Sequence, residues 1–114
     1  MRTVKRAKLL RVHFAESDRW AGRPMHEAVV QRCREMGIAG ITVFRGLEGF
    51  GDKAEMRRGG LLHHDQPIVA TIVDSAENVE RIAAELEGMI EGGVIVVSEV
   101  EAIRVEKGGQ EARG

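Results

Sequence analysis

Cysteine is nearly absent from this chain of 114 residues, because Cys33 is the only one. A single cysteine excludes an internal disulfide, and its place on the predicted inner face of a helix suits a small buried hydrophobe. No apolar run approaches the roughly 18 residues of a membrane-spanning helix, and Met1 to Arg11 lacks the long uncharged core of a signal peptide. These absences predict a protein of the reducing cytoplasm.

The chain also lacks an excess of charge of either sign. Seventeen Lys and Arg residues stand against eighteen Asp and Glu residues, which gives a formal net charge of -1. No strong overall field recruits nucleic acid, so a nucleic-acid partner is not expected. Hydrophobic residues make up 43% of the chain, which is typical of an ordered globular domain.

Alternating and helical apolar patterns predict the first half of the fold. Lys8 to Glu16 alternates as a strand does. A helix with apolar residues at spacings of three and four should follow, with Pro24 in its first turn and Gly37 at its end. Ala39 to Arg45 and Pro67 to Asp74 are rich in β-branched residues and predict the second and third strands.

The second half of the chain repeats this order of a helix and a strand. Asp74 or Ser75 can cap a second helix, with Glu77 completing a pattern that resembles a capping box. Gly92-Gly93 should end that helix, and residues 94–100 predict a fourth strand that residues 102–105 prolong or follow.

The order β-α-β-β-α-β predicts a ferredoxin-like α+β fold. Its four-stranded antiparallel sheet carries both helices on one face. Residues 1–105 form the single domain, and residues 106–114 are expected to be a flexible tail. Because the strands also carry apolar residues for the uncovered face, we expect the chain to associate with copies of itself.

A long connection separates the second and third strands. Residues 46–66 contain five glycines and few apolar side chains before Leu61, which predicts a mobile segment. A connection of this length usually has a function.

Several short motifs carry a resemblance to a known family. Gly37-Ile38-Ala39-Gly40-Ile41-Thr42-Val43, followed by Gly49-Phe50-Gly51, resembles a helix-to-strand junction and loop entry of PII signal-transduction proteins. Together with Glu16-Ser17-Asp18-Arg19 and Pro67-Ile68-Val69, these motifs are similar to a PII-like family of unknown function, the domain of unknown function 190.

The resemblance implies a homotrimer whose sheets face one another, with the 46–66 connection projecting from it. It implies a nucleotide in the cleft between subunits that changes this loop, which docks on transporters or enzymes. Thr42 matches a threonine that meets the adenine base, and Arg104 matches an arginine that contacts phosphate. Gly49, Phe50 and Gly51 would lie at the loop entry.

Two departures from the PII pattern bear on the effector. The glycine-rich, lysine-containing phosphate loop is replaced by Glu91-Gly92-Gly93, and Glu106 stands where a second arginine is expected. Both changes argue against ATP bound in the PII manner. They leave AMP, a cyclic nucleotide or another small anion as candidate effectors.

Other residues allow a functional and a structural interpretation. Arg19 and Trp20 could hold an anion or stack on a base at a subunit cleft. Gly49-Phe50-Gly51 could be a hinge or a simple tight turn. Arg57 and Arg58 in the loop could grip a phosphate or carboxylate of a partner, or belong to a solvated loop tip.

Two further interpretations concern metal binding and catalysis. His63 and His64, with Asp65 and a more distant His13 or His26, offer ligand chemistry for zinc, nickel or copper, although their spacing matches no standard motif. Ser17, Asp18 and His64 could serve a small enzyme, but a turn closed by the Ser17 or Asp18 side chain is an equally simple explanation.

These observations favour a non-enzymatic, trimeric PII-like regulator that binds a small effector and presents its loop to a protein partner. A membrane transporter or channel is the partner that the resemblance suggests. A metal-binding or ion-tolerance trimer of the same fold, with His63 and His64 as ligands, is the alternative, and a small enzyme comes third.

Overall fold

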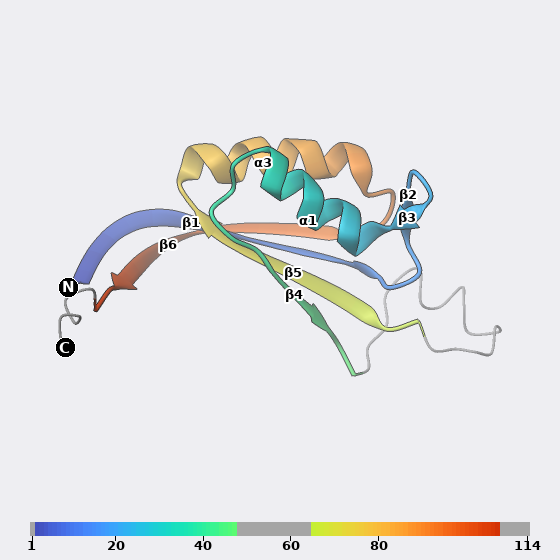
Figure 1. Ribbon diagram of the computed structural model, residues 1–114, viewed down its shortest axis with the longest axis horizontal. Coiled ribbons are helices and arrows are strands. Elements are labelled where there is room, and N and C mark those ends of the chain that lie inside the picture. Colours follow the sequence, from blue (N-terminus) through green and yellow to red (C-terminus); the bar gives the residue numbers. More distant parts are fainter. Residues whose placement is uncertain (1, 48–64, 108–114) are drawn as a thin grey trace.

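A four-stranded antiparallel sheet organises the molecule, with the strand order β4-β5-β1-β6. The computed structural model describes residues 2–47 and 65–107. The chain forms, in order, β1 (Arg2–Ala15), β2 (Arg19–Trp20), β3 (Arg23–Pro24), α1 (Met25–Glu35), β4 (Thr42–Arg45), β5 (Pro67–Asp74), α3 (Ala76–Met89) and β6 (Val94–Val105). Both helices cover one face of the sheet (Figure 1), so the predicted βαββαβ arrangement is confirmed. The short β2–β3 hairpin is an addition that the sequence pattern did not indicate.

The core lies between the helices and the sheet. Alternate residues of β1 point into it, so that Leu10 and Val12 are fully buried and Phe14 nearly so. The helices contribute the stripes that their three- and four-residue spacing predicts. The buried helical residues are Met25, Ala28, Val29 and Cys33 of α1 and Val79, Ile82, Leu86 and Met89 of α3.

The helix ends differ from the prediction in three details. Pro24 is the N-cap of α1 and so precedes the first turn, whereas Gly37 does follow the end of the helix in the left-handed conformation, with φ of +75°. Ser75 caps α3 by accepting a hydrogen bond from the Asn78 N–H at 3.1 Å. The third helical position, where a capping box needs Glu or Gln, is therefore Asn78 and not Glu77. The capping box with Glu77 is therefore wrong. α3 ends at Met89, before Gly92-Gly93.

Three of the four strands have bounds other than those predicted, and only β5 matches the predicted third strand. β1 begins at Arg2 rather than at Lys8, and β6 runs without a break to Val105. β4 starts only at Thr42, because the backbone of Ala39 donates to the carboxylate of Asp74 instead of joining the sheet.

The longer strands build a two-stranded arm. β5 pairs with β1 only from Lys8 onwards, so Arg2–Ala7 is paired on one side alone, with residues 100–105 of β6. Figure 1 shows this arm curving away from the body. Val4, Ile103 and Val105 of the arm are each between 45% and 63% exposed.

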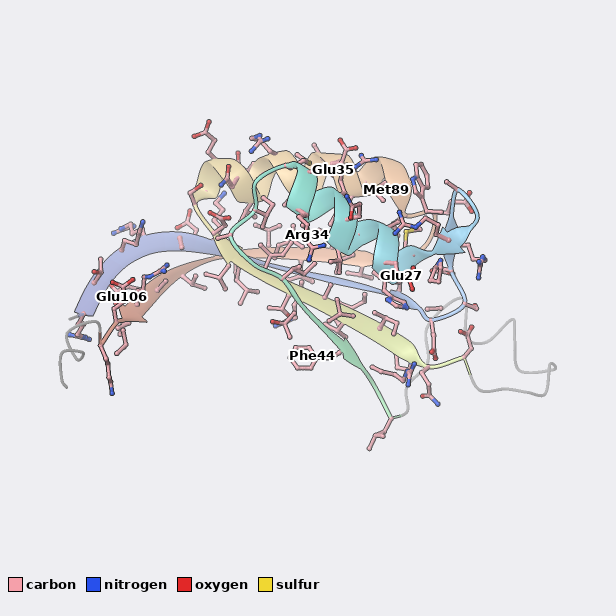
Figure 2. The ribbon with its side chains drawn as sticks, in the orientation of Figure 1. Glu27, Arg34, Glu35, Phe44, Met89 and Glu106 are labelled. Carbon is pink, nitrogen blue, oxygen red and sulfur yellow. The ribbon has the colours of Figure 1, made fainter. Side chains whose placement is uncertain are left out.

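The sheet face away from α1 and α3 is called here the open face, and neither of these two helices covers it (Figure 1). Its residues follow from the strand pairing and are Leu9, Arg11, His13, Thr42, Phe44, Val69, Thr71, Val73, Val94, Val96 and Ser98. Phe44 points away from the helices (Figure 2) and is 56% exposed, and Val94 is 57% exposed. The prediction of apolar side chains on both faces of the sheet is confirmed.

Candidate functional site

The base of the 46–66 connection is tied to the turn that follows β1. The Gly46 N–H donates to the Pro67 carbonyl at 2.7 Å, and the Glu16 N–H donates to the Gln66 carbonyl at 2.9 Å. The carboxylate of Asp65 accepts from both the backbone N–H and the hydroxyl of Ser17, each at 2.9 Å. The two ends of the connection therefore leave the body side by side.

An ion pair adds to this base. Arg45, the last residue of β4, lies 2.6 Å from the carboxylate of Glu16. Both groups are partly exposed, so the pair contributes little to stability by itself. Its effect is positional, because it joins the start of the connection to the same turn that holds its end.

The Glu16-Ser17-Asp18-Arg19 motif is a structural turn. The Asp18 side chain is 8% exposed, and its carboxylate accepts from the Ala15 N–H at 3.2 Å. The Asp18 carbonyl accepts from the Met25 N–H at 2.8 Å, which fixes the entry to α1. The interpretation as a turn closed by a side chain is confirmed for Asp18.

Arg19 and Trp20 form one side of the β2–β3 hairpin. The guanidinium of Arg19 donates to the Gly22 carbonyl at 2.8 Å, and Trp20 is half-buried against the core. The turn residues Ala21 and Gly22 both have positive φ, of 52° and 80°. Arg19 is exposed and lies two residues after Ser17, which binds the end of the connection.

Thr42 and Arg104 lie far apart within one chain. Strand pairing aligns Thr42 with Thr71 and Thr71 with Arg11, whereas Arg104 pairs with Thr3 in the arm. The stretch of β1 from Thr3 to Arg11 spans roughly 26 Å at the usual rise per residue. One chain therefore does not bring these two predicted effector ligands together.

Arg104 already has a carboxylate beside it. Its Nε lies 2.9 Å from the carboxylate of Glu106, the residue that replaces the second arginine of the PII pattern. Both side chains are more than half exposed, so the pair is weak and opens readily to a stronger anion. Figure 2 places Glu106 at the end of the arm.

The remaining predicted residues belong to the 46–66 connection. Gly49, Phe50, Gly51, Arg57, Arg58, His63 and His64 all lie outside the described residues. Within residues 2–47 and 65–107, no group of three or more His, Cys, Asp or Glu side chains is placed to hold a metal ion. His13 lies on the open face and His26 on α1, so these two histidines do not converge.

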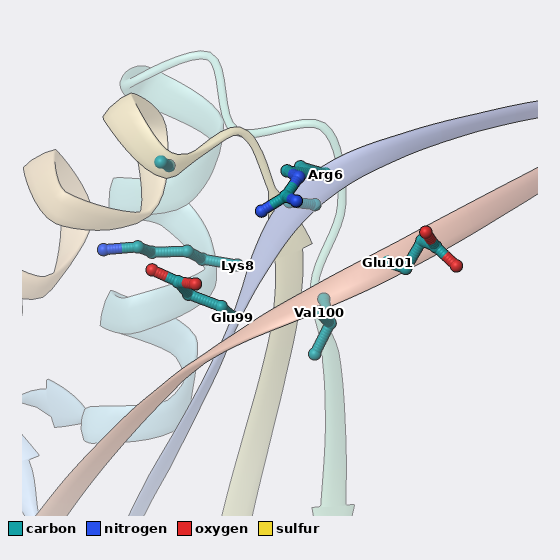
Figure 3. Close-up of a pocket in the computed structure, with 7 residues that line it drawn as sticks. Arg6, Lys8, Glu99, Val100 and Glu101 are labelled. Atoms are coloured by element: carbon teal, nitrogen blue, oxygen red, sulfur yellow. The ribbon is translucent and has the colours of Figure 1, made fainter.

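A shallow hollow of about 380 Å³ lies at the root of the arm, next to the start of α3 (Figure 3). Its charged lining residues are Arg6, Lys8, Glu99 and Glu101. A hydrogen bond with Glu80 raises the pKa of Lys8, and its ammonium lies 2.5 Å from the Glu80 carboxylate. Because cations and anions alternate here, the hollow selects no ligand of one sign, and it contains none of the predicted effector residues.

Asp74, the last residue of β5, connects the start of α3 with the segment that precedes β4. Its carboxylate accepts from the backbone N–H groups of Ala39, at 2.8 Å, and Ser75, at 2.7 Å, and from the side chain of Asn78 at 3.2 Å. Burial alone would raise the pKa of Asp74, but these hydrogen bonds and the charge of Lys5 outweigh it, so the pKa lies below its usual value. Asp74 thus holds the segment before β4 against α3.

Sequence reasoning underestimates Asp65 and Asp74. It treats Asp65 only as a companion of His63 and His64, and Asp74 only as a helix cap. Both carboxylates instead bind groups that are more than thirty positions away in the chain. Such contacts become visible only once the strands are paired. The one signal in the sequence is that Asp65 lies just before, and Asp74 at the end of, the predicted strand 67–74.

The antiparallel sheet with two helices on one face, and a long connection between its second and third main strands, is the fold of the PII-like proteins. A model of the family described as DUF190, Uncharacterized ACR, matches residues 7–102, and the chain belongs to this family. The UPF0166 protein of Aquifex aeolicus (strain VF5) is 36% identical over 105 residues, which are 90% of this chain and 98% of that protein. UPF0166 protein MJ1524 of Methanocaldococcus jannaschii is 26% identical over 103 residues, which are 89% and 95%.

Solved structures of low sequence identity share the fold. CPII of Thiomonas intermedia K12, a nitrogen regulatory PII-like protein bound to ADP, AMP and bicarbonate, matches with a TM-score of 0.65 and 16% identity over 88% of this chain and 98% of that one. The apo form of CPII matches with a TM-score of 0.62 and 17% identity over 92% and 100%. The PII-like protein TTHA0516 of Thermus thermophilus has a TM-score of 0.57 and 18% identity over 95% and 96%. These matches confirm the resemblance to PII-like proteins.

Proposed function

We propose that this protein is a non-enzymatic PII-like regulator of the cytoplasm that assembles as a homotrimer. It binds a small effector, an adenine nucleotide, in the clefts between subunits, and it presents the 46–66 connection to a protein partner. The family and the fold support this class of function, and CPII, which shares the fold, binds ADP and AMP. In the parts of the chain that the structure describes, neither helix combines the length and apolar composition that crossing a bilayer requires.

The separation of Thr42 from Arg104 is the observation that carries the proposal. Both residues match PII effector ligands, yet roughly 26 Å of β1 separates their positions in one chain. A neighbouring copy can supply the missing ligand, because the arm projects beyond the body and carries Arg104 near its tip (Figure 1). The exposed apolar side chains of the open face and the arm give such an assembly a driving force.

The anchored base of the connection gives the effector a way to act on the partner. The hairpin residues Arg19 and Trp20 follow directly after Ser17 and Asp18, and the backbone and hydroxyl of Ser17 bind Asp65 at the end of the connection. An effector held by the hairpin would favour one arrangement of this base. By linkage, a partner that prefers that arrangement then raises effector affinity by the same factor. A membrane transporter or channel is the partner class proposed by analogy.

Calorimetric titration of the purified protein with AMP and ADP tests this function. We expect saturable binding to a trimer, with the affinity lowered at least about tenfold by Thr42→Ala and by Arg104→Ala, since each removes a direct ligand contact. Arg34→Ala, which removes an exposed arginine of α1, is the control and should bind as the wild type does. An affinity unchanged in both test variants, or no binding by the wild type, contradicts the proposal.

A further inference from the structure

A polar row crosses the middle of the apolar open face. Strand pairing sets Thr42 of β4 beside Thr71 of β5, and Thr71 beside Arg11 of β1. The positions that flank this row are apolar except for His13. Phe44, Val69 and His13 lie one step along the strands, and Leu9 and Val73 lie one step the other way. Paired residues have Cβ atoms about 5 Å apart, so Arg11 and Thr71 can bind the same small ligand.

None of these three side chains has a polar partner within the described residues. Two other arginines of the body meet carboxylates, since Arg32 contacts Glu85 and Arg45 contacts Glu16. Arg11 does not, and no aspartate or glutamate occurs among the described residues of the open face. The face is therefore apolar with cationic and hydroxyl groups at its centre.

When another molecule covers the open face, Arg11 needs a negatively charged partner. Burying an unpaired guanidinium costs several kcal/mol, so a covered Arg11 requires a counter-charge. A second copy that brings its own open face supplies another Arg11 and no carboxylate from the described strands. A small anion held between the copies resolves the conflict.

We propose that Arg11 and Thr71, with Thr42 at the end of the row, bind an oxyanion on the open face. The guanidinium fork matches two oxygens of a phosphate or carboxylate group, and the threonine hydroxyls can donate to the others. The ligand is either free phosphate or the phosphate group of a nucleotide. This inference rests on the self-association part of the proposed function, and it differs from the effector cleft in that it does not use Arg104.

Thermal unfolding of the full chain in phosphate and in chloride, at equal ionic strength and protein concentration, tests the site. We expect phosphate to raise the Tm of the wild type in a saturable way, because it binds the native state. Arg11→Met should abolish the rise or shift its half-saturation at least about tenfold, since it removes a charged hydrogen-bonding group. Arg34→Met, which deletes an equal charge on α1, should keep the rise unchanged.

The opposite results overturn the site. No phosphate-dependent rise in the wild type shows that Arg11 needs no added anion, and an equal rise in Arg11→Met and Arg34→Met places any anion elsewhere. If Arg11→Met fails to fold, Thr71→Val decides in its place. It removes only a hydroxyl, so an unchanged half-saturation for phosphate in Thr71→Val then overturns the site.

Two further readouts separate this inference from the proposed function. AMP titrated in the same assay identifies the source, because a nucleotide phosphate on Arg11 makes AMP binding as sensitive to Arg11→Met as phosphate binding is. Light scattering gives the mass of the particle. A monomer contradicts both the trimer and the covered open face from which the site is argued, whereas a nucleotide-binding trimer without the Arg11-dependent phosphate effect keeps the proposed function and rejects the site.

Discussion

Replacing Asp74 by alanine removes one carboxylate that accepts three hydrogen bonds. The bonds from the Ala39 N–H, the Ser75 N–H and the Asn78 amide measure 2.8, 2.7 and 3.2 Å. Each bond to a partly exposed carboxylate is worth about 1 kcal/mol, so Asp74→Ala should lower the free energy of unfolding by about 2 to 4 kcal/mol. Glu77→Ala, which removes an acid from the first turn of α3, is the control and should cost no more than about 1 kcal/mol.

The pH dependence of this loss follows from the lowered pKa of Asp74. A carboxylate with a depressed pKa in the folded state stabilises the protein above its unfolded pKa, about 3.9 for aspartate, and loses this effect as the pH falls through the folded value. The difference in stability between wild type and Asp74→Ala should therefore be constant from pH 7 to about pH 5 and shrink below about pH 4.

Urea unfolding followed by circular dichroism, at fixed protein concentration and at several pH values, measures both effects. A loss no larger for Asp74→Ala than for Glu77→Ala would refute the assigned role of Asp74. A difference that stays constant down to about pH 2, below the usual pKa of aspartate, would show that the carboxylate charge is not what the three donors recognise.

Three further predictions concern single positions. Gly93→Ala should destabilise the protein by about 2 to 3 kcal/mol in urea unfolding, since the added Cβ would lie 2.2 Å from the His13 carbonyl oxygen. Gly88→Ala in α3, where a Cβ meets no atom within 4 Å, should instead stabilise the protein by about 0.5 to 1 kcal/mol. Equal effects of the two substitutions would contradict this packing. Ala21→Gly should raise stability by about 1 kcal/mol, because Ala21 has φ of 52°, and a loss would exclude strain there. Burial raises the pKa of Cys33 to about 11, so its thiol should react with a disulfide reagent at about pH 8 far more slowly than in unfolded protein, and equal rates would show that it is accessible.

The elements of the fold were predictable because apolar periodicity records them. The alternation in Lys8–Glu16 and the stripe from Val79 to Met89 each bury one face, and burial is what the spacing encodes. The arm was not predictable, because half of Arg2–Ala7 is charged and all of it but Ala7 is exposed, so it lacks an alternating apolar pattern. Its strand structure comes from pairing with residues 100–105, which lie at the other end of the sequence.

The candidate site was predictable only in part. Thr42 could be singled out by resemblance, but its alignment with Thr71 and Arg11 depends on the strand register, which local sequence does not specify. The distance between Thr42 and Arg104 likewise depends on the length of β1 and β6. Contacts such as Asp65 with Ser17 join segments that no local motif connects.

Mixing two inactive variants tests most directly whether the effector cleft is shared between copies. Trimers assembled from equal amounts of Thr42→Ala and Arg104→Ala subunits contain sites in which the intact Thr42 of one copy meets the intact Arg104 of the next. Random mixing around a symmetric ring predicts that about a quarter of the sites recover the wild-type affinity for AMP. No recovery in the mixed trimers, although each variant folds and assembles, would contradict a cleft built from two copies.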